Sequence, residues 1–266
     1  MDNTYFHQQT AGKPLFSDVI WSQPEQQSTA GKLAIIGGSG HGFYTVSRAY
    51  ADASKTGIGS IRVLLPDVLK RTVSYLLPES EFAPSTKSGG LARSSLSILV
   101  ELAAWADGVL FPGDLGKSSE TAILMEHYLE KNTSLLSLAG DAISIIYDSP
   151  SLILDNDRLC LILDFNQLQK LLLNIRFPMA ARSQMTIYQM AELLHALTLG
   201  YPWSVITEHE NLFFVAYGGK VSATSKEDYT LAAAGVAASV WRLQQPTKTF
   251  EAESSGLYVL TNGAVA

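Results

Sequence analysis

Cysteine is nearly absent from the chain, since Cys160 is the single one among 266 residues. One cysteine excludes an internal disulfide, and no Cys/His cluster has the spacing of zinc ligands. Residues 1–6 also lack the basic and apolar regions of a secretory signal. Together these features favour a reducing compartment, and we expect the protein to be cytoplasmic.

Runs of basic residues and long apolar runs are missing as well. The 19 Lys and Arg against 25 Asp and Glu give a formal net charge of -6, with no cationic cluster that would neutralise a phosphate backbone. We therefore expect no nucleic-acid partner and favour a small molecule. The most apolar helical stretch, 231–241, is shorter than the roughly 20 residues that span a bilayer, so we expect no membrane segment.

The hydrophobic content is 47%, which is enough for a sizeable core. Residues 1–30 are polar and interrupted by prolines, with a few large apolar residues between 16 and 21. This pattern predicts a lead-in strap at 1–30, followed by one domain over 31–266. The apolar residues of the strap and the alanine-rich last helix are compatible with a homo-oligomer contact, and equally with burial in the core.

Short apolar runs alternate with helical patterns along the domain. Continuous apolar runs that end at Gly or Pro indicate strands buried on both faces of a parallel sheet. The sequence therefore predicts an α/β domain with a mostly parallel central sheet, whose ligands bind beyond the carboxyl ends of the strands. The predicted strands are 33–36, 61–65, 108–111, 135–138 and 159–163, with an antiparallel hairpin of 204–207 and 212–217; the predicted helices are 43–55, 91–106, 119–131, 167–174, 183–199 (capped by Ser183) and 227–245.

Two glycine-rich turns follow predicted strands, at 37–40 and 112–116. Gly116-Lys117-Ser118 is not a P-loop, because that motif requires glycine where Phe111 stands, and the first turn lacks the dinucleotide fingerprint. Such turns either hold an anion on unpaired backbone N–H groups or use glycine only for a tight bend.

Three segments resemble the signatures of one family. They are Ile35-Ile36-Gly37-Gly38-Ser39, the stretch 53–59 (Ala-Ser-Lys-Thr-Gly-Ile-Gly), and 111–116 (Phe-Pro-Gly-Asp-Leu-Gly). Their order and spacing, over roughly residues 30 to 245, resemble the ADP/ATP-dependent NAD(P)H-hydrate dehydratases of the ribokinase-like superfamily. The resemblance implies a three-layer α/β/α fold with a mostly parallel central sheet.

The chemistry that this resemblance implies is phosphoryl transfer from ATP or ADP, with Mg²⁺, to hydrated NADH or NADPH, followed by elimination of phosphate. Such transfer requires a base and an anion hole. The family's Gly-Thr-Gly-Asp turn corresponds to residues 225–228, which makes Asp228 the catalytic candidate. Glu227 puts a negative charge where the phosphoryl group would be stabilised, and Lys226 would offset part of it. Equally, Ser225 is an N-cap with Glu227 and Asp228 in the first turn of a helix.

The resemblance also assigns binding positions, without assigning a metal ligand. Asp141 either faces the site or caps the next helix. Asp164 stands where the family has a histidine, followed by Gln167 in place of a glutamate, and Glu208 in place of a lysine-glycine pair disfavours phosphate. The substrate-binding positions are Gly37, Gly38, Thr45, Gly113, Gly116, Asp141 and Asp164, and the nucleotide-binding positions are Thr207, Glu208, His209, Ser225, Lys226 and Glu227.

Three functions follow from this pattern. The first is an ADP/ATP-dependent NAD(P)H-hydrate dehydratase with weakened activity. The second is a catalytically inactive ribokinase-like protein that binds a ligand or a partner, which the lost glycines and Glu208 favour. The third is a small-molecule kinase of the same superfamily. Nucleotide binding separates them, because both enzyme hypotheses require a nucleotide ligand.

Overall fold

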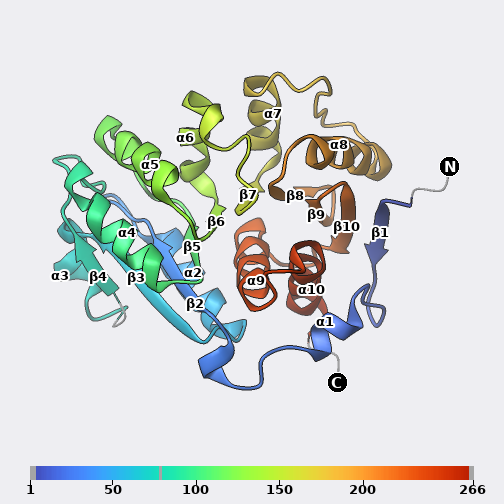
Figure 1. Ribbon diagram of the computed structural model, residues 1–266, viewed down its shortest axis with the longest axis horizontal. Helices are drawn as coiled ribbons and strands as arrows, with labels where there is room; N and C mark the ends of the chain where they lie inside the picture. Colours follow the sequence, from blue (N-terminus) through green and yellow to red (C-terminus); the bar gives the residue numbers. More distant parts are fainter. Residues whose placement is uncertain (1–3, 78–79, 264–266) are drawn as a thin grey trace.

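A ten-stranded sheet forms the centre of the computed structural model, which describes residues 4–77 and 80–263 (Figure 1). The parts of the expected strap and domain at 1–3, 78–79 and 264–266 lie outside the described residues. The strand order is β1-β10-β9-β8-β7-β6-β5-β2-β3-β4. The strands are β1 (Phe6–Gln9), β2 (Lys32–Ile36), β3 (Ser60–Pro66), β4 (Ser80–Ala83), β5 (Gly108–Phe111), β6 (Leu135–Leu138), β7 (Leu159–Leu163), β8 (Ser204–His209), β9 (Leu212–Tyr217) and β10 (Lys220–Ser225).

The pairing is parallel from β4 to β8 across the sheet, and β9 runs antiparallel to both β8 and β10. The predicted mostly parallel sheet and the hairpin are therefore confirmed. Strand β1, from the segment expected as a strap, pairs parallel with β10 at the edge of the same sheet.

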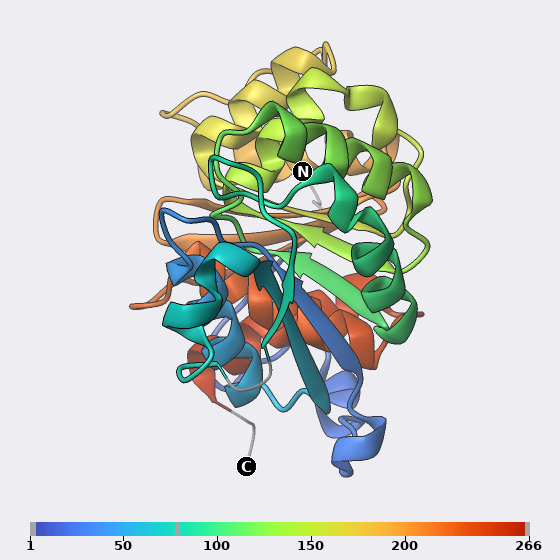
Figure 2. The same ribbon diagram turned by 90° about the vertical axis from the view of Figure 1, so that its left-hand side faces the viewer.

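Helices cover both faces of the sheet, which gives three layers (Figure 2). Helices α4 to α8 pack on one face, whereas α2, α3, α9 and α10 pack on the other, with α1 against α10. The helices are α1 (Ser17–Trp21), α2 (Tyr44–Lys55), α3 (Lys70–Val73), α4 (Leu96–Trp105), α5 (Ser119–Lys131), α6 (Ile143–Asp148), α7 (Phe165–Asn174), α8 (Ile187–Gly200), α9 (Leu231–Gln244) and α10 (Thr249–Asn262).

The apolar runs of the strands follow from this two-sided cover. Successive strand side chains point to opposite faces of a sheet. In β2, Leu33 and Ile35 belong to the core on the α9 side, while Ala34 and Ile36 belong to the core on the α5 side. The last four residues of β2 are thus each buried on one face or the other, and no polar alternation appears.

The sequence predicted several elements with their observed bounds, namely β5, β6, β7 and α5. Several helix starts were wrong. The helix expected from 91 begins at Leu96, after a 3-10 turn at Arg93–Ser95, and the helix expected from 167 begins at Phe165. The helix expected from 183 begins at Ile187, because Thr186 forms a capping box with Gln189. The last helix, expected over 227–245, is α9 alone.

The expected start of the last helix falls in strand and turn. Ser225 ends β10, Glu227 has a φ of 46°, and Thr230 is the N-cap of α9, where its side chain accepts from the Ala233 amide. Neither Ser225 nor Asp228 therefore caps or enters the helix. A second helix, α10, follows α9 and packs along it. No helix within the described residues is long and apolar enough to cross a membrane.

A buried ionic cluster lies where α9 and α10 meet the sheet. The side chains of Arg242 and Glu253 are 2% and 0% exposed, with Nη1 and Oε1 3.6 Å apart. Ser204 Oγ donates to the same carboxylate at 2.7 Å, and the second carboxylate oxygen has no partner. Burial raises the pKa of Glu253 to about 6, although Arg242 and Ser204 lower it. Burial also raises the pKa of the neighbouring Cys160 thiol.

We expect Glu253 to make stability fall as the pH rises. Its raised pKa in the folded protein means that the fold favours the protonated acid, so this contribution is present below the unfolded pKa and is lost as pH rises through about 6. Relative to Glu253→Gln, the wild type should lose about 1 kcal/mol of unfolding free energy between pH 5 and pH 7.5. Urea unfolding at both pH values measures this, and equal pH slopes in the two proteins would contradict it.

Candidate functional site

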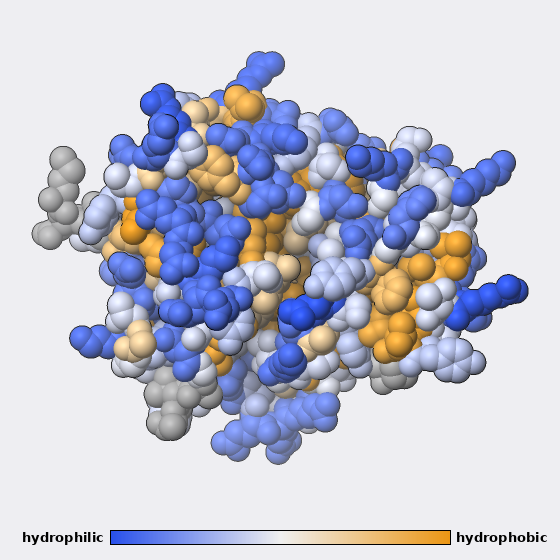
Figure 3. Space-filling model, turned by 180° about the vertical axis from the view of Figure 1, so that it is seen from behind, coloured by the Kyte–Doolittle hydropathy of each residue, from blue (hydrophilic) through white to orange (hydrophobic). Residues whose placement is uncertain are grey.

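The loops after β2, β5 and β6 meet at the carboxyl edge of the sheet. A Cβ on Gly37 would lie 2.6 Å from the Gly113 carbonyl oxygen, so glycine is required there for the loops to approach. A Cβ on Gly113 would lie 3.5 Å from Asp141 Oδ1. The structure therefore brings together Gly37, Gly38, Gly113, Gly116 and Asp141 as the resemblance implies. The view from behind in Figure 3 shows hydrophobic residues exposed near the middle of this face, between hydrophilic ones.

Many of the backbone amides of these loops already have partners within the chain. Asp141 accepts from the amides of Leu115 and Gly116, each at 3.2 Å, and Asp114 accepts from the Thr45 amide at the start of α2 at 2.9 Å. The amides of the first turn donate to backbone carbonyls: Gly37 to Leu64, Gly38 to Gly113, Ser39 to Gly42 and Gly40 to Gly89. The amides of Gly37 to Gly40, Leu115 and Gly116 are thus occupied, whereas those of Gly113 and Asp114 have no hydrogen-bond partner among the described residues. Asp141 fastens the β5 loop instead of capping the next helix.

Two carboxylates give this edge a negative charge. The pKa of Asp141 is raised, because desolvation by burial and the neighbouring Asp114 outweigh the backbone hydrogen bonds that lower it. Asp114, which accepts the hydrogen bond from the first turn of α2, has a backbone φ of 61°. Asp tolerates this left-handed conformation better than most residues. A depression of about 430 Å³ lies over them, and Lys117 is the cation in its lining.

A separate, largely apolar cavity lies between α2 and α9 and measures about 190 Å³. Thr45 Oγ1 is buried there without a hydrogen-bond partner. Arg48 and Asp52 form an ion pair of 3.7 Å one turn further along α2. The remaining lining residues are Tyr44, Ala49, Leu110, Pro112, Ala139, Ile162, Thr230, Ala232 and Val236. Thr45, predicted to bind substrate, therefore lines this cavity.

Asp228 does not line the depression over Asp141. It is exposed and lines a groove of about 580 Å³ together with Arg48, Asp52 and Thr230, between α2, α9 and α10. The depression over Asp141 has a different lining. Asp228 thus lines a different hollow from Asp141 and Gly116, and its groove shares Arg48, Asp52 and Thr230 with the cavity between α2 and α9.

Four of the residues predicted to bind nucleotide form hydrogen bonds with one another. Lys226 Nζ donates to Glu208 Oε2 at 2.6 Å, and Ser225 Oγ donates to Glu227 at 2.8 Å. The lysine that would offset the charge of Glu227 is thus paired with Glu208.

The other two nucleotide positions are buried in β8. His209 Nε2 bonds the Met185 carbonyl at 2.6 Å, and the ring stacks on Phe165. Thr207 is buried, with Oγ1 lacking a partner.

Asp164 is the N-cap of α7. It accepts from the Gln167 amide at 2.8 Å, while Gln167 Oε1 accepts from the Asp164 amide at 3.0 Å, which forms a capping box. Gln167 Nε2 also donates to the Gly140 carbonyl at 2.7 Å. The two residues that replace the family's histidine and glutamate therefore form a structural link between α7 and the loop of Asp141.

Asp114 and the Arg48–Asp52 pair were missed by sequence reasoning. Their signals are an Asp inside a Pro-Gly-Asp turn, where a positive φ is common, and opposite charges four residues apart on one helix. Within residues 4–77 and 80–263, no group of three or more His, Cys, Asp or Glu could hold a metal ion.

Comparison with known proteins rests on structure, because no family model and no curated protein matches the sequence. A ribokinase-like superfamily protein from Enterococcus faecalis matches with a TM-score of 0.70 and 13% identity, covering 98% of this chain and 88% of that chain. The chain has the ribokinase-like fold. The three-layer fold that the resemblance implied is thereby confirmed.

Two further structures share this ribokinase-like fold. A hypothetical protein from Streptococcus mutans matches with a TM-score of 0.67 and 17% identity, over 92% of this chain and 86% of that chain. The ADP/ATP-dependent NAD(P)H-hydrate dehydratase of Bacillus subtilis, co-crystallised with ATP and Mg²⁺, matches with a TM-score of 0.61 and 13% identity over the same shares.

We expect Asp164→Ala to lower the unfolding free energy by about 1 kcal/mol, because the capping box is lost. Asp164→Ser, which keeps an N-cap oxygen, should restore most of it. Urea unfolding of the three proteins measures the difference. Unchanged stability together with weakened ligand binding would instead place Asp164 in contact with ligand.

Proposed function

We propose that this protein binds a small ligand at the carboxyl edge of its ribokinase-like sheet, in the cavity between α2 and α9, without phosphoryl transfer. The observation that carries the proposal is the pair of carboxylates on the loop amides, Asp114 on Thr45 and Asp141 on Leu115 and Gly116. A phosphate group that binds these three amides would have to displace both carboxylates, and their negative charges repel it.

The arrangement around Asp228 also supports binding without transfer. A catalytic base must lie within reach of the hydroxyl that it deprotonates, close to the donors that stabilise the transferred group. Here Asp228 precedes the N-cap Thr230 on an exposed turn, and Lys226 is paired with Glu208. The cation nearest in sequence to the candidate base is thus engaged elsewhere.

The cavity itself favours an uncharged ligand with one ring. Its lining includes the buried apolar side chains of Leu110 and Ile162 and the exposed Ala232, and Thr45 Oγ1 supplies a hydrogen-bonding group without a partner. Burying a hydroxyl costs free energy unless it is hydrogen-bonded, so a ligand hydroxyl or carbonyl that meets Thr45 is favoured.

The NAD(P)H-hydrate dehydratase function is the second candidate. The likeness to the Bacillus subtilis dehydratase, over 92% of this chain, favours it. In that case the nucleotide would bring Mg²⁺ bound to its phosphates, since Mg²⁺ is usually held by one or two carboxylates together with phosphate oxygens.

We expect calorimetry to detect no binding of ATP or ADP, each with Mg²⁺, tighter than about 1 mM. The matched variant Asp114→Asn with Asp141→Asn removes both charges and should bind the nucleotides more tightly than the wild type, because a phosphate no longer meets two carboxylates. Circular dichroism establishes that both proteins are folded. Micromolar binding to the wild type, with recovery of NADH from its hydrate and loss of that activity in Asp228→Asn, would establish the dehydratase instead.

Binding in the cavity is tested with single-ring probes. We expect phenol and nicotinamide to give saturation-transfer NMR signals with the wild type, and Ala232→Leu to abolish them by filling the cavity. Ala232 is exposed, so this change should leave the fold intact. Ala104→Leu, at an exposed position on α4, is the control and should retain the signals. Equal signals from all three proteins would place the probes outside this cavity.

A further inference from the structure

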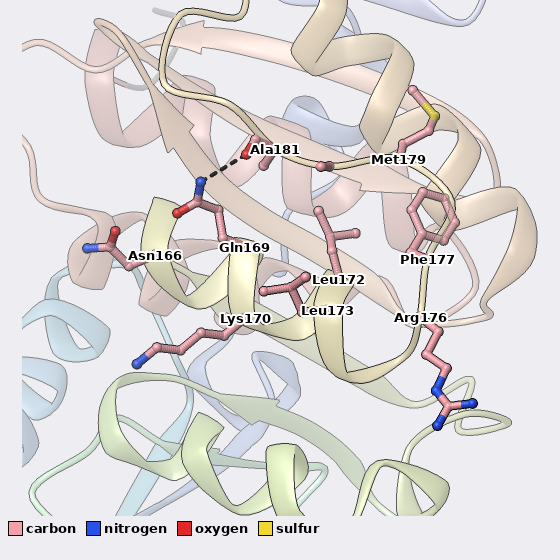
Figure 4. Close-up of a pocket in the computed structure, with 10 residues that line it drawn as sticks. Asn166, Gln169, Lys170, Leu172, Leu173, Arg176, Phe177, Met179 and Ala181 are labelled. Carbon is pink, nitrogen blue, oxygen red and sulfur yellow. Dashed lines mark hydrogen bonds between the residues drawn. The ribbon is translucent and has the colours of Figure 1, made fainter.

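A groove that the proposed function does not use lies between α7 and the segment 175–181 (Figure 4). It belongs to the helical layer on the other face of the sheet from α2 and α9. Its volume is about 600 Å³, within the roughly 300–1,000 Å³ range of small-molecule sites. The residues around it are Asn166, Gln169, Lys170, Leu172, Leu173, Arg176, Phe177, Met179, Ala180 and Ala181.

The groove is apolar and has fixed walls. Leu173 is 75% exposed although it is a large apolar side chain, and Phe177 and Met179 are partly buried beside it. Gln169 Nε2 donates to the Ala181 carbonyl at 2.9 Å, and this bond fastens the outer wall to α7. The groove is therefore formed before any ligand arrives.

Cations border the groove without a partner. Figure 4 shows Lys170 and Arg176 on either side of Leu173. Within the described part of the chain neither forms an ion pair, and none of the ten lining residues is acidic. The chain as a whole carries a net charge of -6, so the positive charge of Lys170 and Arg176 is opposite in sign to the net charge of the protein.

Arg176 occupies a position that usually belongs to glycine. The Arg176 amide donates to the Leu173 carbonyl at 3.1 Å and the Phe177 amide to the Leu172 carbonyl at 2.8 Å, which together form the Schellman end of α7. The φ of Arg176 is 54°, a conformation that costs a residue with a Cβ free energy that glycine avoids. Glycine would end the helix at lower cost in free energy, so the presence of arginine at this position indicates that its positive charge has a function.

We propose that this groove binds a single-chain anionic amphiphile, with the alkyl chain on Leu173, Phe177 and Met179 and the carboxylate at Lys170 or Arg176. Burial of the chain on exposed apolar side chains supplies the affinity, and the cations select the sign of the head group. The absence of acidic lining residues removes the repulsion that an anion meets elsewhere on this surface.

The test uses three probes with the same alkyl chain, decanoate, decanol and decyltrimethylammonium, titrated below their micelle concentrations into the full-length protein. We expect decanoate to bind at least about fivefold more tightly than the cation, with a preference that weakens as salt rises. Leu173→Ser should weaken all three, because the apolar contact is lost.

The variant Arg176→Gly distinguishes the effect of the arginine charge on binding from the effect of the residue on stability. Glycine relieves the backbone strain, so this variant should unfold at higher urea concentration than the wild type while losing part of the preference for decanoate. Arg176→Gly with Lys170→Gln should lose the preference altogether, whereas Lys131→Gln, at an exposed lysine on α5, should retain it. Equal binding of the three probes to the wild type, an undiminished preference in the double variant, or no binding of decanoate would each overturn the proposal.

Discussion

Burial of both faces of the central strands is the constraint on which the rest of this structure depends. Every residue of β5 and β7 is buried, so each of these strands needs a helical layer on either side. Charged side chains are absent from β5, β6 and β7, and the carboxylates of Asp141 and Asp164 follow the ends of β6 and β7. The same constraint makes the Arg242–Glu253 pair inside the α9 layer costly, because burial removes water from both charges.

The loops at the carboxyl edge show how a common fold can retain its geometry and change its chemistry. The close approach of Gly37 to Gly113 is kept, and with it the path of the backbone. Three amides at this edge, those of Thr45, Leu115 and Gly116, are bonded to Asp114 and Asp141, so the chain itself supplies negative charge here. What distinguishes the site is therefore the pattern of side chains on the loops.

Much of the fold could be predicted from the sequence, because two-sided burial leaves continuous apolar runs. Strands β5, β6 and β7 and the N-capped helix α5 carry such local signals. Strand β1 carries none, since its four residues, Phe6–Gln9, are mostly polar and gain their place only by pairing with β10. The start of α9 was misplaced because Ser225 and Thr230 are both good N-caps, and the choice between them depends on how far β10 extends.

The candidate site was predictable in its loops and unpredictable in its contacts. Glycines that follow strands predicted the meeting of the 37–40 and 112–116 turns. The partner of a carboxylate depends on distances between segments far apart in the chain, as with Asp141 and Gly116 or Lys226 and Glu208. The role of Asp164 was local, since a capping box with Gln167 is visible in sequence, but the resemblance directed attention to ligand instead.

The pairing of β1 with β10 has a consequence for the order of folding. Gln9 donates its buried side-chain amide to Thr224 and to the Ser254 carbonyl, groups separated from it by most of the chain. Closing so long a loop costs entropy that nearby contacts do not repay, and non-local pairing of this kind slows folding. On the ribosome, the first strand to emerge therefore has to wait until β10 and α10 have been synthesised. Until then the edge of the growing sheet stays open to other chains.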